Sequence, residues 1–306
     1  MRAPLDGLDL NLLVTLQALL HESSVTRAAT RLGQSQPTVS RSLSTLRTAF
    51  GDPLLVRAGR GMALTPFAHS LERPLRRALS AIDHLRGVGG FVPERSARVF
   101  RLALPDVLAN PIVPRLLERF GAGAPTASLV LVGTERDALR ALLDDDVELV
   151  VGATPLQHPE LFGQVVASAF SWSVVCAEAL ADTVRTVDGW LGLPHVQLVP
   201  SGRPDTPGLL DRALSASGRE RQVVLRLSHV SALPLTLASG RLVASLPTPI
   251  ARVVAGSTLA VVPHPLGTAL PGLELRTSWR EAHQTDAGHA WFRTLVADVV
   301  RSLEDP

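Results

Sequence analysis

Apolar residues in the first fifty positions recur at helical spacing in three stretches, which short polar breaks separate. From Asp9 onward, leucines spaced three and four residues apart form a single stripe and predict one helix. Ser23 and Ser24 can cap a second, shorter helix over residues 25–32, and a glycine follows that stretch. A third helix is predicted from about residue 36 to residue 50, because Ser35 can cap it and a proline is tolerated in its first turn.

These stretches have the arrangement of a helix-turn-helix, in which about three residues around a glycine join two short helices. The second helix of that motif enters the major groove of DNA. Away from its apolar stripe, the third stretch carries residue types that suit a groove, namely Gln36, Thr38, Ser40, Arg41, Ser44 and Arg47. Two strand-like runs around a glycine-rich turn follow at residues 53–57 and 62–64, so a β-wing with Arg60 at its tip is predicted.

A longer amphipathic stretch begins at Thr65 and Pro66 and covers roughly 20 residues, which gives a helix of about 30 Å. Its apolar stripe is too long for the small wing to bury, so pairing with the same helix of a second chain is expected. Packing within one chain is the alternative. Pro74 lies inside the stretch and is expected to kink the helix or to remove one hydrogen bond. Residues 87–90, Gly-Val-Gly-Gly, then mark a linker and a domain boundary.

Beyond this linker, apolar β-type runs alternate with helical stretches through most of the chain. Such alternation predicts a parallel sheet with helices on both faces. The length of 306 residues suits two or three packed cores. No stretch approaches about 20 apolar residues without a charge, a proline or a glycine, which argues against a transmembrane helix.

The N-terminus and the single cysteine indicate the compartment. Residues 1–10 lack the basic, apolar and small-residue order of a signal peptide, so the chain is expected in the cytoplasm. Cys176 lies in an apolar, strand-like run, and we expect it to be a buried core residue and not a nucleophile.

Charge is distributed unevenly along the chain. Residues 1–90 hold 11 Arg against 6 acidic residues, whereas residues 91–306 hold 19 Arg against 22 acidic residues. A basic first segment suits a nucleic-acid partner. Ordinary scatter of surface charge is the alternative interpretation.

Residues 8–68 resemble the LysR family of bacterial transcription regulators, in the family's order of helix, helix-turn-helix, wing and linker helix. Two runs carry the resemblance: SQPTVSRSLSTLR at residues 35–47 and FGDPLLVR at residues 50–57. Later segments, which are His229, residues 262–265 and residues 279–293, are similar to the family's nodulation-factor and aromatic-acid-responsive branch.

The resemblance implies a mixed fold with three parts. An all-α winged helix-turn-helix, the DNA-binding domain, would occupy residues 1–65, and a linker helix for dimerisation with a hinge would occupy residues 66–90. Residues 91–306 would form an α/β effector domain with two lobes, like a periplasmic binding protein. Lobe one would combine about 95–165 with 266–303, and lobe two would be about 166–265.

The resemblance also implies a small-molecule effector in the cleft between the lobes, near the carboxyl ends of strands. Mapping by position selects the candidate effector contacts Pro105, Asp106, Thr134, Ala153, Thr154, Ser201, His229, Ser231 and Thr248. Relatives often have Ser or Thr just after the first strand, where a hydroxyl and nearby N–H groups hold a carboxylate. Pro105 supplies neither donor, which argues against an acid effector. His229 can donate to a carboxylate or phenolate, or it is a structural, hydrogen-bonded residue.

The candidate DNA contacts are Ser24, Thr26, Ser35, Gln36, Pro37, Thr38, Ser40, Arg41, Arg57 and Arg60. Arginines are expected to neutralise phosphates, so that binding falls steeply as salt rises. Gln36 can pair with adenine, Thr38 and Ser40 can meet base edges, and Pro37 can pack on a thymine methyl, whereas Ser35 is expected to cap its helix. The expected partners are an imperfectly palindromic operator, a second copy in a dimer or tetramer, the effector and RNA polymerase. No cofactor, metal or membrane is expected.

Three other classes of protein are alternatives. An enzyme would need a nucleophile elbow, a phosphate loop or metal-spaced His and Cys residues, and none appears; residues 144–146, all Asp, suggest a solvated helix end. A solute-binding protein would need export and leaves residues 8–86 unexplained. A regulator whose own side chains fill the cleft, and which senses nothing, stays open as an alternative.

Overall fold

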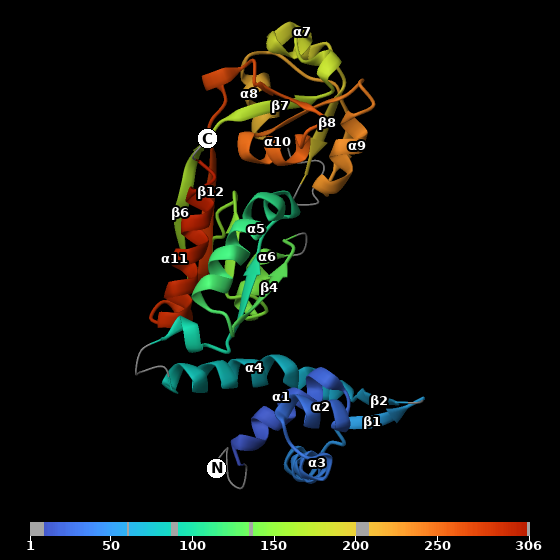
Figure 1. The fold of residues 1–306 in the computed structure, drawn as a ribbon, viewed down its shortest axis with the longest axis vertical. Coiled ribbons are helices and arrows are strands. Elements are labelled where there is room, and N and C mark those ends of the chain that lie inside the picture. Colours follow the sequence, from blue (N-terminus) through green and yellow to red (C-terminus); the bar gives the residue numbers. More distant parts are fainter. Residues whose placement is uncertain (1–8, 60, 87–90, 135–136, 200–207, 305–306) are drawn as a thin grey trace. The chain divides into compact units, whose positions relative to one another are not determined.

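The computed structural model describes residues 9–59, 61–86, 91–134, 137–199 and 208–304. The chain divides into two compact units, unit one (Met1–Gly90) and unit two (Phe91–Pro306), as the elements drawn in Figure 1 illustrate. Unit one contains α1 (Asn11–Glu22), α2 (Val25–Leu32), α3 (Gln36–Phe50), β1 (Leu55–Ala58), β2 (Gly61–Leu64) and α4 (Pro66–Arg86).

The predicted caps and stops position the short helices of unit one. The hydroxyls of Ser24 and Ser35 accept hydrogen bonds from backbone N–H groups three residues further on, at 3.4 and 3.3 Å. Gly33 and Gly51 end α2 and α3 with φ angles of 62° and 66°, which glycine adopts without strain. The apolar stripes then meet in one core, whose fully buried members include Leu16, Leu19, Ala28, Val39 and Leu46.

The stripe of α4 is partly buried within its own chain. Ala68 and Leu75 are buried in the core of unit one, and Leu71 and Leu79 pack against it, with α1 as the neighbouring helix. The sequence favoured pairing of this stripe with a second chain, which stays a prediction; within its own chain, part of the stripe packs against α1. α4 continues through Pro74 as one helix of 21 residues.

Unit two contains two five-stranded sheets, one in each lobe. Lobe one has the strand order β4-β3-β5-β12-β6, with β3 (Val99–Ala103), β4 (Ser128–Val132), β5 (Leu149–Gly152), β6 (Leu161–Phe170) and β12 (Leu273–Arg280). Its helices are α5 (Asp106–Gly123), α6 (Ala138–Leu143) and α11 (Ala287–Arg301).

Lobe two has the strand order β11-β7-β10-β8-β9, with β7 (Trp172–Cys176), β8 (His195–Leu198), β9 (Val223–Leu227), β10 (Val243–Pro247) and β11 (Ala260–Pro263). Its helices are α7 (Val187–Leu191), α8 (Leu209–Ala216), α9 (Leu233–Leu237) and α10 (Thr248–Ala255). Single 3-10 turns lie at Pro93–Arg95, Glu178–Leu180, Thr183–Arg185, Val230–Ala232 (η5), Gly267–Ala269 and Glu281–His283.

Both sheets are mixed, which corrects the prediction of a parallel sheet. β3, β4 and β5 are parallel, and so are β8, β9 and β10, but β12 is antiparallel to β5 and β6, and β7 is antiparallel to β10 and β11. The reason is that the chain passes between the lobes twice, and β6 and β12 lie side by side where it does so (Figure 1). The sequence alternation had missed both strands.

One apolar core runs through the junction of the two lobes. Leu108 and Ile112 of α5 belong to the same buried cluster as Leu233, Ile250 and Val254 of lobe two. Cys176 is fully buried in a second cluster, within lobe two, as expected from the sequence. Among the described residues, no helix is both long and apolar enough to cross a membrane.

Candidate functional site

One side of α3 is apolar and buried, and the other carries polar residues that are open to solvent. Val39, Leu43 and Leu46 are buried. The exposed residues of α3 include Gln36, Pro37, Ser40, Arg41 and Ser44. Because residues three and four apart share a helix face, this set forms a continuous polar strip along the first half of α3.

The hydroxyls at the helix starts are used by the fold. Ser35 caps α3 and also shares a hydrogen bond of 2.7 Å with the hydroxyl of Thr38, which is half-buried. Ser24 caps α2 and is half-buried, whereas Thr26 is exposed. The structure therefore gives Ser24 and Ser35 capping contacts, and Ser35 has the role that its position in the sequence indicated.

Arg47 differs from the other polar residues of α3. Its Nε donates to the carbonyl of Pro53 at 2.7 Å, and its Nη2 donates to the carbonyl of Leu55 at 2.9 Å. Arg47 thus holds the loop between α3 and β1, and it is not free to read a groove as its place in the sequence suggested.

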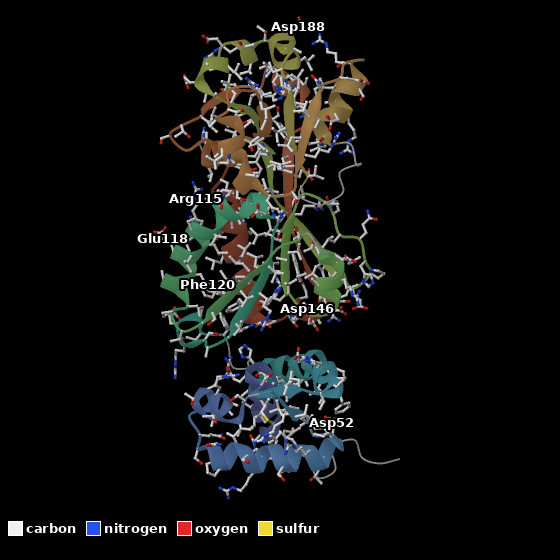
Figure 2. All side chains as sticks on the ribbon, turned by 90° about the vertical axis from the view of Figure 1, so that its right-hand side faces the viewer. Asp52, Arg115, Glu118, Phe120, Asp146 and Asp188 are labelled. Atoms are coloured by element: carbon white, nitrogen blue, oxygen red, sulfur yellow. The ribbon has the colours of Figure 1, made fainter. Side chains whose placement is uncertain are left out.

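The wing is a short antiparallel hairpin in which Arg57 pairs with Met62, and the side chain of Arg57 is exposed. Arg60 lies outside the described residues. Asp52, labelled in Figure 2, ties the wing to α4, because its Oδ1 accepts from the N–H of Leu54 and from the hydroxyl of Thr65, each at 2.7 Å. Leu54 has a φ of 59°, so the carboxylate holds a residue in a conformation that leucine rarely adopts.

In unit two, a hydrogen bond joins two of the segments that the sequence selected for the effector. Asp106 is the first residue of α5 in lobe one, and its Oδ2 accepts from the backbone N–H of Val230 in lobe two at 2.8 Å. Val230 begins η5, and its neighbours in the sequence, His229 and Ser231, are both exposed.

The remaining effector candidates are dispersed. Thr134 is half-buried beyond β4, and Ala153 and Thr154 are exposed beyond β5. The hydroxyl of Thr248 donates to the carbonyl of Ser171 at 3.0 Å and lies 2.8 Å from the hydroxyl of Ser173, so the fold itself uses it. Pro105 forms the N-cap of α5 without a side-chain hydrogen bond, and Ser201 lies outside the described residues.

A cavity at the junction of the lobes has only apolar side chains in its wall. It is small, with a cavity volume of about 10 Å³, and it is lined by Leu108, Phe170, Pro247, Pro249, Ile250, Leu273, Leu275 and Leu303. Leu108 lies in the first turn of α5, two residues beyond Asp106.

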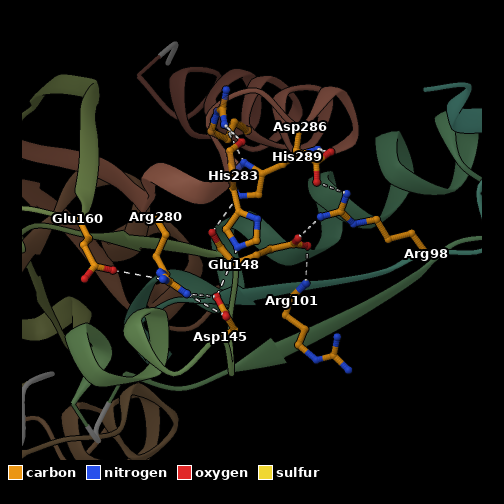
Figure 3. A network of polar contacts seen from close by, with 10 residues as sticks. Arg98, Arg101, Asp145, Glu148, Glu160, Arg280, His283, Asp286 and His289 are labelled. Carbon is orange, nitrogen blue, oxygen red and sulfur yellow. Dashed lines mark hydrogen bonds and ion pairs between the residues drawn. The ribbon is translucent and has the colours of Figure 1, made fainter. Parts of the chain in front are cut away.

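A network of charged groups lies at the other end of lobe one, as Figure 3 shows. Arg98 pairs with Glu148 at 2.6 Å and with Asp286 at 2.7 Å. The fully buried ring of His289 lies 2.8 Å from the carbonyl oxygen of Glu148 through Nε2 and accepts from Arg293 through Nδ1. Burial lowers the pKa of His289 to about 3, so the ring is neutral.

Asp145 also belongs to this network and is not a solvated helix end. Arg280 donates to its two carboxylate oxygens at 2.9 Å, and His283 lies 3.5 Å from it. Burial would raise the pKa of Asp145, but the hydrogen bonds from His283 and Arg280 hold it below its ordinary value. Within the described parts of the chain, no three His, Cys, Asp or Glu residues are placed to hold a metal ion.

Lobe two buries a cluster of three rings, one from a tryptophan and two from histidines. The ring centroid of Trp190 lies 4.7 Å from the ring centroids of both His195 and His264. Burial lowers the pKa of each histidine to about 4, so both are neutral core residues. His264, which the sequence singled out, lies 3.1 Å from the hydroxyl of Ser245.

Comparison with known proteins agrees with this architecture. Residues 10–69 match the family described as bacterial regulatory helix-turn-helix protein, lysR family, and residues 93–301 match the LysR substrate binding domain. The chain belongs to the LysR family. It is 31% identical to the HTH-type transcriptional activator NahR of Pseudomonas putida, over 96% of this chain and 98% of that protein.

Other relatives of this LysR-family chain are named as a transcriptional regulator and as a nodulation protein. It is 33% identical to SyrM of Rhizobium meliloti (strain 1021), over 96% of this chain and 89% of SyrM. A Nodulation protein D 1 from Bradyrhizobium is 28% identical over 95% of this chain and 92% of that protein. The expected family and its nodulation branch are confirmed, and the chain is a DNA-binding transcriptional regulator, not an enzyme.

Solved structures give the same fold. A probable transcriptional regulator from Pseudomonas aeruginosa has a TM-score of 0.75 and 29% identity, covering 96% of this chain and 97% of that one. Full-length CbnR, solved in complex with its target DNA, has a TM-score of 0.62 and 18% identity, covering 95% of this chain and 100% of that one, so it shows the fold alone.

Two structural residues of this LysR-family regulator escaped the sequence analysis. Asp52 lies within the run that carries the family resemblance, yet its partner Thr65 is 13 residues away. Arg47 is a residue type that suits a DNA contact, but its guanidinium donates to the carbonyl of Pro53 in the next loop. No spacing rule identifies either role, because both depend on how the wing folds back.

Proposed function

We propose that this LysR-family regulator reads its operator with Gln36, Ser40 and Arg41 of α3. The observation that carries the proposal is the exposure of these three side chains on a capped helix whose opposite face is fully packed. Gln36 can make two hydrogen bonds to adenine, Ser40 can reach a base edge, and Arg41 can contact a phosphate or guanine. Arg57 of the wing, and Arg60, would add phosphate contacts.

The experiment is retention of the DNA upstream of the regulator's own gene in a gel, followed by footprinting. Gln36→Ala and Arg41→Ala should each weaken retention about tenfold or more, since one good base contact contributes about 1–3 kcal/mol of discrimination. Arg252→Ala removes the same charge from an exposed site on α10 and serves as the matched control. Unchanged binding by both α3 variants, with normal melting temperatures, would contradict the proposal.

We further propose that the regulator binds an imperfectly palindromic operator as a dimer or tetramer. Two edge strands of unit two, β4 and β9, support self-association because they carry exposed apolar side chains, which are Val130, Leu131 and Val132 on β4 and Val224 on β9. Leu117, on α5, is 58% exposed. Unpaired edges and exposed apolar side chains are typical of protein–protein interfaces.

The effector domain is proposed to bind a small molecule near Asp106, His229 and Ser231. RNA polymerase is the proposed protein partner in activation. The proposed site of action is the cytoplasm, where bacterial DNA lies.

One observation favours the alternative of a regulator that senses nothing: Asp106 itself bridges the lobes, across a junction whose core is apolar. An effector that changes the footprint at micromolar concentration would exclude this alternative.

A further inference from the structure

The two strands that connect the lobes, β6 and β12, pair irregularly where they run side by side (Figure 1). Ala167 and Phe170 of β6 pair with Leu275 and Leu273 of β12, so two residues of β6 lie opposite one residue of β12. A second shift in the pairing follows next to Ala167. A β-bulge of this kind leaves a residue unpaired in the ladder and bends the strand. The ladder therefore fixes the path of β6 less firmly here than a regular pair of strands would.

The turn that follows α11, Ser302–Glu304, contacts this bulge. Oε1 of Glu304 accepts the backbone N–H of Ser168, which lies between Ala167 and Phe170 in the bulge, at 2.7 Å. A side chain reaches the backbone here because β6 is the edge strand of its sheet. The carboxylate thus satisfies a backbone donor at the point where the ladder is interrupted.

The other two residues of the turn hold it in place. The carbonyl and hydroxyl oxygens of Ser302 accept from Nη1 of Arg115 on α5, at 2.8 and 3.3 Å. Leu303 is 7% exposed and lines the same small cavity as Phe170 of β6 and Ile250 of α10. The turn therefore connects α5, the apolar junction of the lobes and the bulged strand.

From these contacts we propose that the turn Ser302–Glu304 is a latch on the connection between the lobes. While Glu304 holds Ser168, the bulge of β6 keeps one conformation, and the angle between the two sheets is restricted. The hydrogen bond is exposed to solvent, so water can replace it and the latch opens without unfolding either lobe. The latch lies within unit two and does not depend on the proposed DNA contacts or on the proposed effector.

Hydrogen exchange of the full chain tests the latch through Glu304→Ala, which removes the acceptor. Residues 165–170 of β6 and residues 249–255 of α10, across the junction, should exchange about fivefold faster, the factor expected from losing one exposed hydrogen bond. The strands β3 and β8, inside the two lobes, should be unchanged. Asp298→Ala is the matched control, because it removes a carboxylate of α11 that pairs with Arg301 and should leave both segments as in the wild type.

Two further variants separate the latch from a general loss of stability. Glu304→Gln keeps an acceptor oxygen and should give a smaller increase in exchange than Glu304→Ala. Arg115→Ala releases the turn from α5 and should speed exchange in the same two segments. Its effect and that of Glu304→Ala should be less than additive in the double variant, because both act through one turn.

Three results would overturn the inference. They are unchanged exchange at residues 165–170 in Glu304→Ala, faster exchange there without any change in α10, and an equal increase throughout both lobes. The second result would make Glu304 a local cap of the strand, and the third would make it a general stabilising residue. If Glu304→Ala does not fold, exchange in Glu304→Gln and Arg115→Ala decides the question by the same criteria.

Discussion

Replacing Asp52 by Ala should loosen the wing and the start of α4 together. The carboxylate accepts two hydrogen bonds of 2.7 Å, from the N–H of Leu54 and from the hydroxyl of Thr65, and both contacts are partly buried. Thr65 in turn accepts from the N–H of Ala68 at 3.0 Å, which caps α4. One side chain therefore fixes a positive-φ leucine and the first turn of the next helix.

The magnitude follows from these contacts. A hydrogen bond to a charged group contributes about 1.5–3 kcal/mol, and the two bonds share one acceptor oxygen, so we expect a loss of about 3 kcal/mol. That is a large part of the roughly 5–15 kcal/mol by which a domain is stable. Asp52→Asn keeps one acceptor oxygen and should lose about half as much.

Hydrogen exchange of residues 51–68 in the full chain measures the local free energy of opening. A double-mutant cycle with Thr65→Val isolates the coupling between the two side chains, which should exceed about 1 kcal/mol. Exchange that is unchanged in Asp52→Ala, or additive effects of the two substitutions, would refute the reasoning. DNA retention should fall in proportion to the unfolded fraction and recover on cooling, which a lost base contact would not do.

Arg47→Ala should lower the free energy of unfolding of unit one by about 2 kcal/mol, because the carbonyls of Pro53 and Leu55 lose their guanidinium donor, and Arg47→Lys should have the same effect. A stability equal to wild type in urea would contradict this. Burial lowers the pKa of His289 from 6.5 to about 3, so below pH 6.5 the unfolded chain takes up a proton that the folded chain refuses. His289 should therefore contribute up to about 2 kcal/mol to the fall in stability from pH 7 to pH 5, in addition to the falls from His195 and His264, so His289→Gln should show a smaller total fall in urea titrations. Leu117→Glu should shift the chain toward monomers in light scattering, while Leu235→Glu, at a leucine 85% exposed on α9, should not.

Local signals in the sequence predicted unit one well. Ser24, Ser35 and two glycines delimit α2 and α3 where the caps and stops indicated, because a cap is a contact between residues three positions apart. The same signals identified the exposed strip with Gln36 and Arg41. They failed at Arg47, whose side chain is long enough to reach the next loop and whose charge suggested DNA.

Unit two was predicted less completely, for reasons of distance along the chain. β6, an edge strand, was missed because its exposed and buried side chains follow no simple apolar pattern: Phe162, Gln164 and Val165 are exposed, whereas Val166, Ala167 and Phe170 are buried. β12 was missed as well, because Glu274, Arg276 and Arg280 interrupt its apolar residues. Residues 144–146 looked like a solvated acidic run because Arg280, the partner of Asp145, is 135 residues away. Charge alone predicts exposure, and only the fold supplies the counter-charge.

The same limit bears on the effector. Pro105 shows from the sequence alone that the start of α5 lacks a hydroxyl and an N–H donor at that position. The partner of Asp106 could not be predicted in this way, because Val230 is 124 residues distant, in the other lobe. A carboxylate at a helix start is common and by itself suggests a favourable charge–dipole contact. Its meaning changes once Val230 is placed against it, because the two lobes then share an acceptor that a ligand must join or displace. A ligand that engages Asp106 differently in two lobe arrangements can shift the balance between them, which is the requirement for a chemical signal to reach the DNA-reading unit.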